Sequence, residues 1–533
     1  MKRNTLSPTF LCGLAAVAPA TGAAQRNPGG KHSGRPNIVY IMTDDHAYQT
    51  ISAYGHPISR LAPTPNIDRL AREGMLFREA FVENSISAPS RATLLTGMYS
   101  HRHKQTTLSY GIMDSTLVYF PELLRAEGYR TAIFGKWHLS VEPKGFDYYD
   151  LFWDQGEYYN PVMRTPQTGG KYVRQEGYAT DIVTDHALTW LDGHRDDDKP
   201  FCLMIHHKAP HRNWMADLKY LDLYEDVEFP EPETLFDDYA TRGDQMRQQE
   251  LTIDRHMGYA FDFKVEELKD EPTLQYIHDS WDIAMSTLTP EQRRVWDEAY
   301  GRKNRDFLAH RPEGKELLRW KYQRYIHDYC RTIRSVDEQI GRVLDYLEEH
   351  GMMDNTLIVY TSDQGFLLGE HGLYDKRFMY EESFRTPLIM AWRGHIRPGS
   401  VCRQLVQNID YAPTLLDAAG VEVPGDMDGV SLQPLFRNGK ARDWRTSLYY
   451  QYYDYPAVGT VRAHYGIRTD RYKLIHWFGP GANGDSDIDF WELYDLKKDP
   501  CEVHNIYEDA HYAGVRRDLS RMLAEKRREL DIR

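Results

Sequence analysis

Residues 87–97 read SAPSRATLLTG, so that the Ser87 hydroxyl comes two residues before Pro89 and four before Arg91. Proline is favoured in the first turn of an α-helix. The backbone N–H groups of that turn, the helix dipole and the guanidinium would all favour an anion beside the hydroxyl. The stretch therefore predicts a nucleophile aimed at a negatively charged group. Taken alone, it also fits a plain N-cap at Ser87 and a surface cation at Arg91.

These eleven residues resemble, position by position, the signature of the type I sulfatases, in which a Cys or Ser is oxidised to formylglycine. The resemblance implies that Ser87 becomes the aldehyde, and that Pro89 and Arg91 are needed for recognition by the maturing enzyme. A serine at this position is similar to the subset matured by a radical-SAM enzyme that works without oxygen. A Cys-to-Ser change, or a serine that stays unmodified, remains open.

The composition is that of a globular enzyme with an acidic balance. The chain has 533 residues, 41% of them hydrophobic, with 65 Lys and Arg against 79 Asp and Glu, a net charge of −14. This length can bury a sizeable core. The negative charge argues against a nucleic-acid partner. An anionic substrate must therefore be met by a local cationic pocket.

The N-terminus has the pattern of an export signal. Residues 1–24 combine a basic start, a weakly apolar run and small residues at the end, which predicts a signal peptide cleaved near Ala24 and an exported, periplasmic protein. Residues 25–36 are a polar spacer. Cys12 follows Leu11 rather than a small residue, which disfavours a lipid anchor. No other apolar run is long enough to span a membrane.

The cysteines left after removal of the signal are widely separated: Cys202, Cys330, Cys402 and Cys501. They show no C-x-x-C spacing, so neither a zinc site nor a dense disulfide framework is indicated. A single disulfide is compatible with export, and the sequence does not select a pair.

Four short apolar runs are each followed at once by a polar cluster, at residues 37–42, 131–134, 201–205 and 356–360. Such runs are typical of parallel strands buried on both faces. In doubly wound α/β folds the sites lie at the carboxyl edge of the sheet. We therefore expect the four polar clusters to meet at one rim.

Helices are expected between these strands. Residues 65–73 are flanked by Pro and Gly in the order typical of a helix, and an apolar repeat over 325–347 predicts an amphipathic helix that ends near His350. Residues 213–319 are polar and acidic, with a capping box at Thr289. This segment fits either a substrate wall or a helical decoration. We assign residues 37–435 to the catalytic domain.

Residues 436–533 form a smaller α+β subdomain in this interpretation. Short aromatic and β-branched runs separated by Gly, Asp and Pro predict an antiparallel meander, followed by a basic helix from about Val515. The arrangement resembles the C-terminal domain of sulfatases. The expected fold class is thus α/β, an alkaline-phosphatase-like doubly wound sheet with a smaller C-terminal antiparallel sheet and helix.

Two of the polar clusters carry candidate metal ligands. Asp44, Asp45, Asp363 and Gln364 offer hard oxygen atoms that, with an oxygen at residue 87, could hold one Ca²⁺, with Mg²⁺ as the alternative. Each pair alone would also fit a helix cap or a turn. The set holds no His or Cys, which disfavours zinc. The sulfatase resemblance implies that these residues ligate calcium.

Three cations and two histidines complete the predicted site. Arg91, Lys136 and Lys376 would neutralise sulfate oxygens, and His138 and His211 match the two catalytic histidines of the family. We expect His206 and His207 to have mainly structural roles. By resemblance, hydrated formylglycine attacks sulfur with help from the metal and Asp363, His211 protonates the leaving sugar oxygen, and His138 assists the final expulsion of sulfate.

The substrate is indicated by residues 375–383, DKRFMYEES, which resemble the branch containing N-acetylglucosamine-6-sulfatases. This implies exo-acting 6-O-desulfation of glucosamine residues of heparan-type or other glycans. Desulfation of galactosamine at position 6 or of uronate at position 2 is the alternative within the family. The candidate substrate-binding residues are Tyr374, Arg377, His464 and Trp477.

Two functions of other classes stay open. A metal-dependent phosphoesterase would use unmodified Ser87 and zinc. A glycan-binding pseudo-sulfatase would bind sulfated sugar without turnover. The complete set of catalytic residues argues against the second, because a decayed site would be expected to have lost at least one of them.

Overall fold

The computed structural model describes residues 34–195, 197–273, 275–480 and 487–532. The predicted signal peptide, residues 1–24, and all but the last three residues of the spacer lie outside this range. The core of the molecule is a ten-stranded mixed sheet in the order β13-β2-β12-β9-β1-β8-β4-β5-β6-β7. Its strands are β1 (Asn37–Thr43), β2 (Met75–Phe77), β4 (Arg130–Gly135), β5 (Tyr148–Phe152), β6 (Val162–Arg164), β7 (Val173–Arg174), β8 (Phe201–His206), β9 (Thr356–Ser362), β12 (Leu388–Ala391) and β13 (Ser400–Cys402).

Strand β1 is central because both of its faces are apolar. Every residue of the strand is buried. Val39 and Ile41 belong to the hydrophobic cluster on one side of the sheet, and Tyr40 and Met42 to the cluster on the other. Strands β8 and β9 flank β1 in parallel register. The four strands predicted from apolar runs are confirmed.

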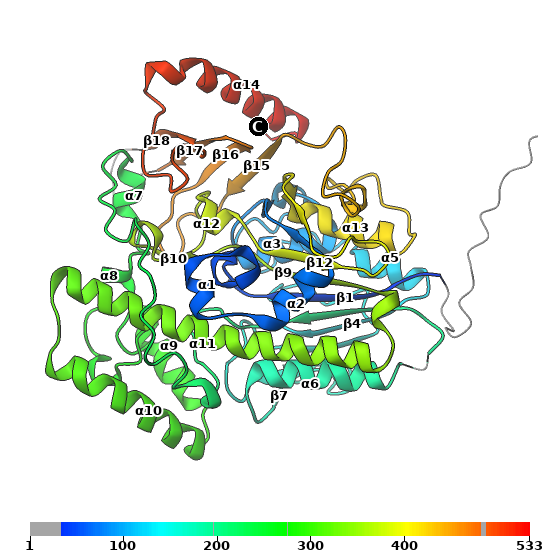
Figure 1. Cartoon of the computed structure of the whole chain (residues 1–533), viewed down its shortest axis with the longest axis horizontal. Coiled ribbons are helices and arrows are strands. Elements are labelled where there is room, and N and C mark those ends of the chain that lie inside the picture. Colours follow the sequence, from blue (N-terminus) through cyan, green and yellow to red (C-terminus); the bar gives the residue numbers. More distant parts are fainter. Residues whose placement is uncertain (1–33, 196, 274, 481–486, 533) are drawn as a thin grey trace, which may run out of the picture.

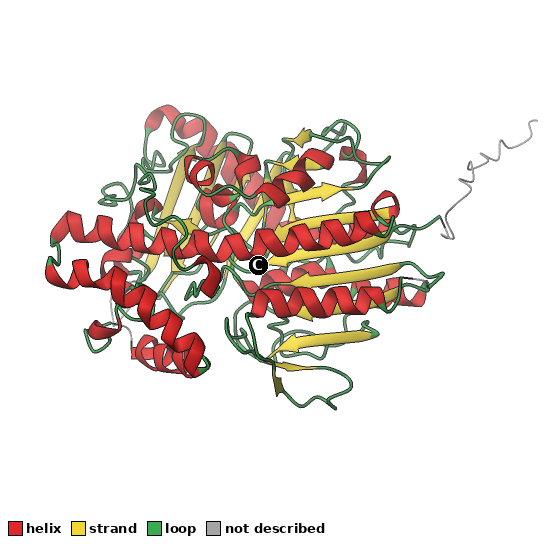
Figure 2. Cartoon of the chain, turned by 60° about the horizontal axis from the view of Figure 1, so that its bottom comes forward, coloured by secondary structure: helices red, strands yellow, loops and turns green. Residues whose placement is uncertain are grey.

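Helices cover both faces of this sheet, as a doubly wound fold requires. Helices α2 (Pro65–Glu73), α6 (Ala179–Asp192) and α11 (Gly314–Glu349) contribute to the cluster on one face. Helices α3 (Ser87–Thr96), α5 (Phe120–Ala126) and α13 (Tyr411–Ala418) contribute to the cluster on the other. Figures 1 and 2 show α6 and α11 lying side by side along the sheet. The predicted amphipathic helix is α11, which ends at Glu349.

The edges of the sheet depart from a purely parallel arrangement. Strand β12 runs antiparallel to β9 and β2, and β6 runs antiparallel to β5 and β7. A parallel connection needs a crossover of about a dozen residues or more, and the short segment between Phe152 and Val162 cannot supply one. The five neighbouring strands β9, β1, β8, β4 and β5 are therefore all parallel, and β13 pairs in parallel with β2 at the edge.

The C-terminal region forms a separate antiparallel sheet, β15 (Ser447–Tyr452), β16 (His464–Thr469), β17 (Tyr472–Gly479) and β18 (Ile488–Asp495), as predicted. Helix α14 (Ala513–Glu529) lies across this sheet, at the top of Figure 1. Leu519 and Leu523 of the helix pack on Ile467, Leu474 and Leu493 of the strands. Apolar contact on one face thus holds the basic helix on the sheet. The predicted domain boundary at residue 435 stays a prediction.

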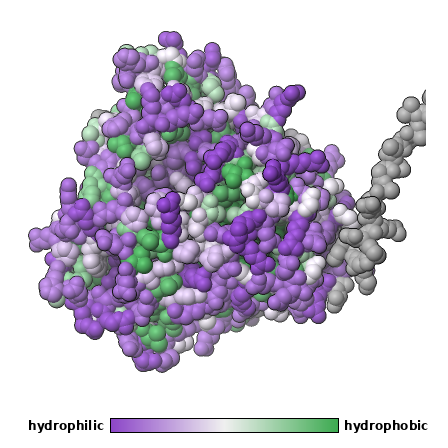
Figure 3. Space-filling model, in the orientation of Figure 1, coloured by the Kyte–Doolittle hydropathy of each residue, from purple (hydrophilic) through white to green (hydrophobic). Residues whose placement is uncertain are grey.

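The remaining helices lie largely in the segment 213–319 and in connections. They are α1 (Pro57–Leu61), α4 (Ser100–His103), α7 (Asp244–Gln248), α8 (Ile253–His256), α9 (Gln275–Ser286), α10 (Pro290–Ala309) and α12 (Glu381–Phe384). The capping box at Thr289 is formed, with Thr289 and Gln292 each bonding the other's backbone N–H. The face seen in Figure 3 is mostly hydrophilic, with hydrophobic residues in small separate groups.

Two expectations from composition can be compared with the described residues. No helix within them is long and apolar enough to cross a membrane. The four cysteines that they contain are unpaired, and Cys202, Cys330 and Cys402 are buried. The disulfide that the sequence left open is therefore not formed among these four.

Candidate active site

The polar clusters that follow the central strands meet at one edge of the sheet. Asp44 and Asp45 follow β1, Lys136 and His138 follow β4, and Asp363 follows β9. Because β1, β4, β8 and β9 are parallel neighbours, their carboxyl ends open on the same rim. The backbone N–H of Asp45 donates to Oδ1 of Asp363 at 3.1 Å, which links two of the clusters directly. The predicted convergence is confirmed.

Ser87 is the first residue of helix α3, and the whole helix is buried. Its hydroxyl donates to Oδ1 of Asp44 at 3.1 Å. Ile86 occupies the N-cap position and makes no side-chain cap bond. Ser87 is therefore not a plain N-cap: its hydroxyl points to the carboxylates at the rim, with the N-terminus of the helix behind it.

Arg91 is buried one turn further along α3 and holds the rim together. Its guanidinium donates to Oδ2 of Asp363 at 3.1 Å and to the backbone oxygen of Lys136 at 2.9 Å. The Lys136 ammonium donates to Oδ2 of Asp44. Neither Arg91 nor Lys136 is a solvated surface cation, because both are almost fully buried. They bring two positive charges onto the carboxylates that surround Ser87.

Asp45 is surrounded by groups from three other segments. Lys376 donates to its Oδ2 at 2.7 Å, and the amide nitrogen of Gln364 donates to its Oδ1. Nε2 of His211 lies 3.8 Å from the same Oδ2. Asp45 has a φ of 67°, a left-handed conformation that is uncommon outside glycine. The Tyr329 hydroxyl accepts a hydrogen bond from the backbone N–H of Ala47 and donates one to the carbonyl of Asp45.

The three buried carboxylates differ in how readily they ionise. Burial alone would raise the pKa of Asp44, but nearby positive charges, led by Lys136, hold it well below its usual range. Burial raises the pKa of Asp45 to about 7 although Lys376 opposes it. Burial and the charge of Asp44 raise the pKa of Asp363 to about 6. The rim thus holds three carboxylates that are each paired with a cation, and burial is the main reason that the pKa values of Asp45 and Asp363 are raised.

The two predicted catalytic histidines come from different loops, since His138 follows β4 and His211 follows β8. Nδ1 of His211 lies 2.7 Å from the backbone oxygen of Arg212, so a proton on Nδ1 would leave Nε2 toward the rim. The Gln155 amide donates to Nε2 of His138 at 2.8 Å. Burial lowers the pKa of both rings well below its usual range, which favours their neutral form.

His206 and His207 are structural, as expected. Both are buried. Nδ1 of His206 lies 3.2 Å from the backbone oxygen of Lys136 and 3.4 Å from the Arg91 guanidinium, so it packs behind the rim. The His207 N–H donates to the backbone oxygen of Met42 at 2.8 Å, which continues the pairing of β8 with β1.

A cavity of about 350 Å³ opens above this rim and gives access to Ser87. Its walls include several predicted site residues, Asp45, Ser87, His138, His211, Lys376 and Arg377. Phe261 and Ser280 also line it, so the polar segment 213–319 contributes a wall of the cavity as well as helices. We call this space the catalytic cavity.

The sequence analysis did not select several residues of this wall, among them Gln155, Arg212, Phe366 and Asp375. Asp375 precedes the predicted catalytic cation Lys376 and begins the stretch 375–383 that indicated the substrate. Its position in the sequence could therefore have selected it as a site residue. Arg212 follows His211 and binds Asp262 through two nitrogens, at 2.7 and 2.6 Å. Gln155 and Phe366 lie in loops with no pattern that could have selected them.

The four predicted substrate-binding residues separate into two groups. Arg377 lines the catalytic cavity and donates to the Tyr452 hydroxyl at 3.1 Å. Tyr374 is fully buried beneath the Arg212 guanidinium, which lies 4.8 Å from its ring centre. His464 and Trp477 are buried and stacked on one another, with ring centres 4.0 Å apart. The placement supports sugar contact by Arg377 and packing roles for the other three.

The residues predicted to hold a metal ion fit a hard cation. Oxygen atoms of Asp44, Asp45 and Asp363 share one rim, and Oε1 of Gln364 is buried without a hydrogen-bond partner among the described residues. A buried acceptor without a partner is what a cation would satisfy. Ligand atoms of His211, Asp44 and Asp45 also lie within 4.8 Å of one another, so a nitrogen atom is close to the predicted oxygen ligands, and the ligand set itself stays a prediction.

Comparisons with known proteins agree with this geometry. The family model described as Sulfatase matches residues 36–421, and the model described as N-sulphoglucosamine sulphohydrolase, C-terminal, matches residues 369–529. The chain is 45% identical over 530 residues to an N-acetylglucosamine-6-O-sulfatase of Bacteroides thetaiotaomicron, covering 98% of this chain and 91% of that protein.

Two solved structures have a similar fold. A protein in complex with its substrate D-glucosamine-2-N,6-O-disulfate matches with a TM-score of 0.86 at 44% identity, covering 93% of this chain and 98% of that chain. A phosphonate monoester hydrolase from Silicibacter pomeroyi matches with a TM-score of 0.66 at 21% identity, covering 93% and 96%. The expected alkaline-phosphatase-like fold is confirmed.

Proposed function

Because this chain belongs to the sulfatase family, we propose that it removes the 6-O-sulfate from a glucosamine residue at the end of a glycan chain. It is a sulfuric ester hydrolase. The observation that carries the proposal is the position of the Ser87 hydroxyl at the floor of the catalytic cavity, on Asp44 and within reach of the charges of Arg91 and Lys136. The relative that is 45% identical supports glucosamine 6-sulfate as the ester.

Binding of the sulfate group follows from the cations around Ser87. Lys136 and Lys376 each pair with one carboxylate of the rim, and Lys376 also lines the catalytic cavity. A sulfate ester carries one negative charge on its outer oxygens, and further negative charge develops on the bridging sugar oxygen as its bond to sulfur breaks. Buried ammonium and guanidinium groups stabilise that charge more strongly than the same groups in water. The cations therefore bind the substrate and favour its transition state.

Proton transfer to the departing sugar oxygen falls to His211. Its Nδ1 is directed to the Arg212 carbonyl, which leaves Nε2 toward the cavity. Burial lowers the pKa of the ring and favours its neutral form, and an anionic ester bound beside it would favour the protonated form. His138, positioned by the Gln155 amide, lines the same cavity as Ser87. It is suited to accept a proton from residue 87 in the step that releases sulfate.

We propose formylglycine at position 87 and one Ca²⁺ ion at the rim, with Mg²⁺ as the alternative. Asp44, Asp45, Asp363 and Gln364 would hold the ion with an oxygen of residue 87. The ion would supply a positive charge that lowers the pKa of a hydroxyl at residue 87. Formylglycine, when hydrated, would supply both the attacking hydroxyl and a second hydroxyl whose collapse releases sulfate, which serine cannot do.

Removal of the metal ion should abolish sulfate release. Purified enzyme treated with a chelator is expected to lose activity by about 10²-fold or more, because the positive charge that would lower the pKa of the hydroxyl at residue 87 is then lost. The measurement is sulfate release after addition of each metal separately. Recovery with Ca²⁺ or Mg²⁺ is expected. Recovery with Zn²⁺ alone would contradict the assignment and favour the contribution of a nitrogen ligand from His211.

Substrate specificity is tested with a panel of matched sugars. The matured enzyme should release sulfate from glucosamine 6-sulfate, N-acetylated or N-sulfated, at least about tenfold faster in kcat/KM than from galactosamine 6-sulfate or a 2-O-sulfated uronate, because a site that hydrogen-bonds the sugar hydroxyls rejects a changed stereocentre. Glucosamine 6-phosphate serves as the phosphoesterase control. Faster turnover of either competing sulfate, or of the phosphate, would overturn the proposed substrate.

We further propose that the protein is exported to the periplasm and matured by a radical-SAM enzyme. The basic and apolar pattern of residues 1–24 supports export. A serine in the sulfatase signature supports a maturing enzyme of the oxygen-independent type. Both proposals concern the protein as its host makes it, so they are tested on material purified from that host, as described in the Discussion.

A further inference from the structure

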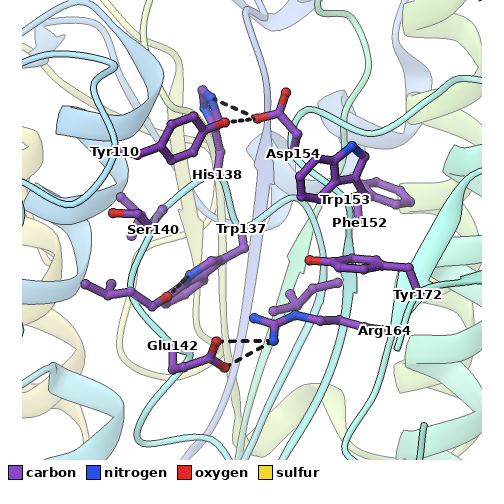
Figure 4. A pocket seen from close by; sticks show the side chains of 13 residues that line it. Tyr110, Trp137, His138, Ser140, Glu142, Phe152, Trp153, Asp154, Arg164 and Tyr172 are labelled. Carbon is purple, nitrogen blue, oxygen red and sulfur yellow. Dashed lines mark hydrogen bonds and ion pairs between the residues drawn. The ribbon is translucent and has the colours of Figure 1, made fainter. Parts of the chain in front are cut away.

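A second cavity, of about 400 Å³, lies beside the catalytic cavity and is not used by the chemistry described above (Figure 4). Residues at or just after the ends of three strands form it. Trp137 comes after β4, Trp153 after β5, and Arg164 ends β6. Tyr110 and Tyr172 complete the aromatic lining from two loops. We call this space the aromatic cavity.

Three large aromatic side chains of the aromatic cavity are exposed to solvent. Tyr110 is 67% exposed, Trp153 58% and Tyr172 40%. The rings of Trp153 and Tyr172 meet edge to face, with centres 5.6 Å apart, and so form a fixed corner. Exposed aromatic rings gathered in a hollow mark a binding site more often than a packing defect. A pyranose fits such a corner, because its C–H face is apolar while its hydroxyls lie at the edge.

Charged groups stand at both ends of the aromatic cavity. Asp154 accepts a hydrogen bond from the Tyr110 hydroxyl at 2.5 Å at one end, and Arg164 pairs with Glu142 at 3.2 Å at the other. The Glu142 side chain is 76% exposed, so this pair contributes little energy. Nε of Arg164 is buried and has no hydrogen-bond partner in the described part of the chain. The guanidinium can therefore exchange Glu142 for an anion on a ligand.

The aromatic cavity and the catalytic cavity share one wall. His138 lines both spaces. Asp154 lines the aromatic cavity with its carboxylate 4.0 Å from Nε2 of His138, and the next residue, Gln155, lines the catalytic cavity and donates to the same nitrogen. A glycan whose terminal sugar fills the catalytic cavity would thus have its following units close to the aromatic rings.

We propose that the aromatic cavity binds a second sugar unit of the glycan, one that bears a carboxylate or sulfate, while the terminal glucosamine occupies the catalytic cavity. The inference deepens the proposed function and rests on it. Trp153 and Tyr172 pack on the face of this unit, and Arg164 binds its acidic group. The enzyme then distinguishes a glycan chain from a single sulfated sugar through contacts made away from the reacting sulfur.

The test compares two substrates in the matured enzyme. Trp153→Ala should lower kcat/KM by about tenfold for a tetrasaccharide that ends in 6-sulfated glucosamine linked to a uronate, because an aromatic contact is lost. It should leave kcat/KM for glucosamine 6-sulfate itself unchanged. Trp153 is largely exposed, so the variant is expected to fold. Phe236→Ala, which removes an exposed aromatic outside both cavities, is the control and should change neither value.

The acidic group is tested separately. Arg164→Gln should lower kcat/KM for the uronate tetrasaccharide by about tenfold, because the ion pair between Arg164 and the uronate carboxylate is lost. The substitution should have no effect on the same tetrasaccharide after its carboxylates are reduced to alcohols, because that substrate forms no such ion pair with wild type or variant. An equal loss with the two tetrasaccharides would show that the substitution acts through the structure and would overturn the role of Arg164.

Binding without turnover separates this inference from the proposed function. A tetrasaccharide of the same backbone without the 6-O-sulfate should change the tryptophan fluorescence of the wild type, and Trp153→Ala and Tyr172→Ala should weaken its binding. If no sulfated glucosamine is turned over but this binding is seen, the proposed function fails and the site stands. If the monosaccharide and tetrasaccharide are desulfated equally well by wild type and variants, the site is refuted and the function stands.

Discussion

Replacing Ser87 by alanine should reduce sulfate release by a factor on the order of 10⁵, because the nucleophile is lost while the cations and the metal ligands remain. The hydroxyl of Ser87 is the group bonded to Asp44, whereas Ser280, which also lines the catalytic cavity, belongs to helix α9 and not to the strand ends. The measurement is kcat/KM with glucosamine 6-sulfate. Substrate binding should persist in the variant, since Arg91, Lys136 and Lys376 are unchanged.

Two further variants decide what residue 87 must become. Ser85→Ala is the matched control, because the Ser85 hydroxyl bonds the backbone oxygen of Ser383 outside the catalytic cavity, and it should keep most of the activity. Ser87→Cys should be active only in a host that oxidises cysteine to formylglycine. Activity of Ser87→Ala within about tenfold of the wild type would refute the nucleophile.

The same question is answered chemically by the mass of the peptide that contains residue 87, taken from protein made in its natural host. Formylglycine is two hydrogen atoms lighter than serine and reacts with an aldehyde probe. The same digest should show a mature chain that begins near Gln25, as export predicts. An unmodified serine in active enzyme would contradict the formylglycine proposal, and a retained Met1 would contradict cleavage of the signal peptide.

Replacing His211 by alanine should slow the desulfation of glucosamine 6-sulfate by about 10²- to 10⁴-fold, the range expected for loss of a general acid. The departing sugar oxygen is strongly basic and needs a proton as the bond to sulfur breaks. Nε2 of His211 is directed toward the rim and lies 3.8 Å from Asp45. The effect should appear in kcat more than in KM, because the proton is needed only in the transition state.

The leaving group provides the control for this role. An aryl sulfate whose phenolate leaves without a proton should be hydrolysed by the His211→Ala variant within about tenfold of the wild type. His186→Ala, which removes a part-exposed histidine that pairs with Asp150, should affect neither substrate. Equal losses of His211→Ala on sugar and aryl sulfates would show that the ring positions the rim rather than donating a proton.

Much of the site could be predicted because it follows from the ends of parallel strands. Asp44, Lys136 and Asp363 each come directly after a buried apolar run, and neighbouring parallel strands place such residues on one rim whatever the loops do. The antiparallel edges and the aromatic cavity involve no such rule. They depend on loops whose course the local sequence does not specify.

The walls around the substrate show this limit most clearly. Trp477 and His464 are an aromatic and a polar side chain that could line a sugar pocket, yet both are buried and stacked in the core of the C-terminal sheet. Phe261 and Ser280 come from the least informative segment and line the catalytic cavity. Burial is decided by which distant elements pack against a residue, and alternation along one strand cannot reveal that.

The sequence by itself selected the candidate nucleophile, cations and carboxylates of this sulfatase, through their resemblance to the family signature and through strand ends that parallel pairing brings to one rim. Only the tertiary structure decided which aromatic rings face solvent beside His138, and which are buried beneath Arg212 or in the C-terminal sheet. Apolar rings stabilise a core and a sugar site by the same loss of contact with water. Their role is therefore set by what the fold places against them.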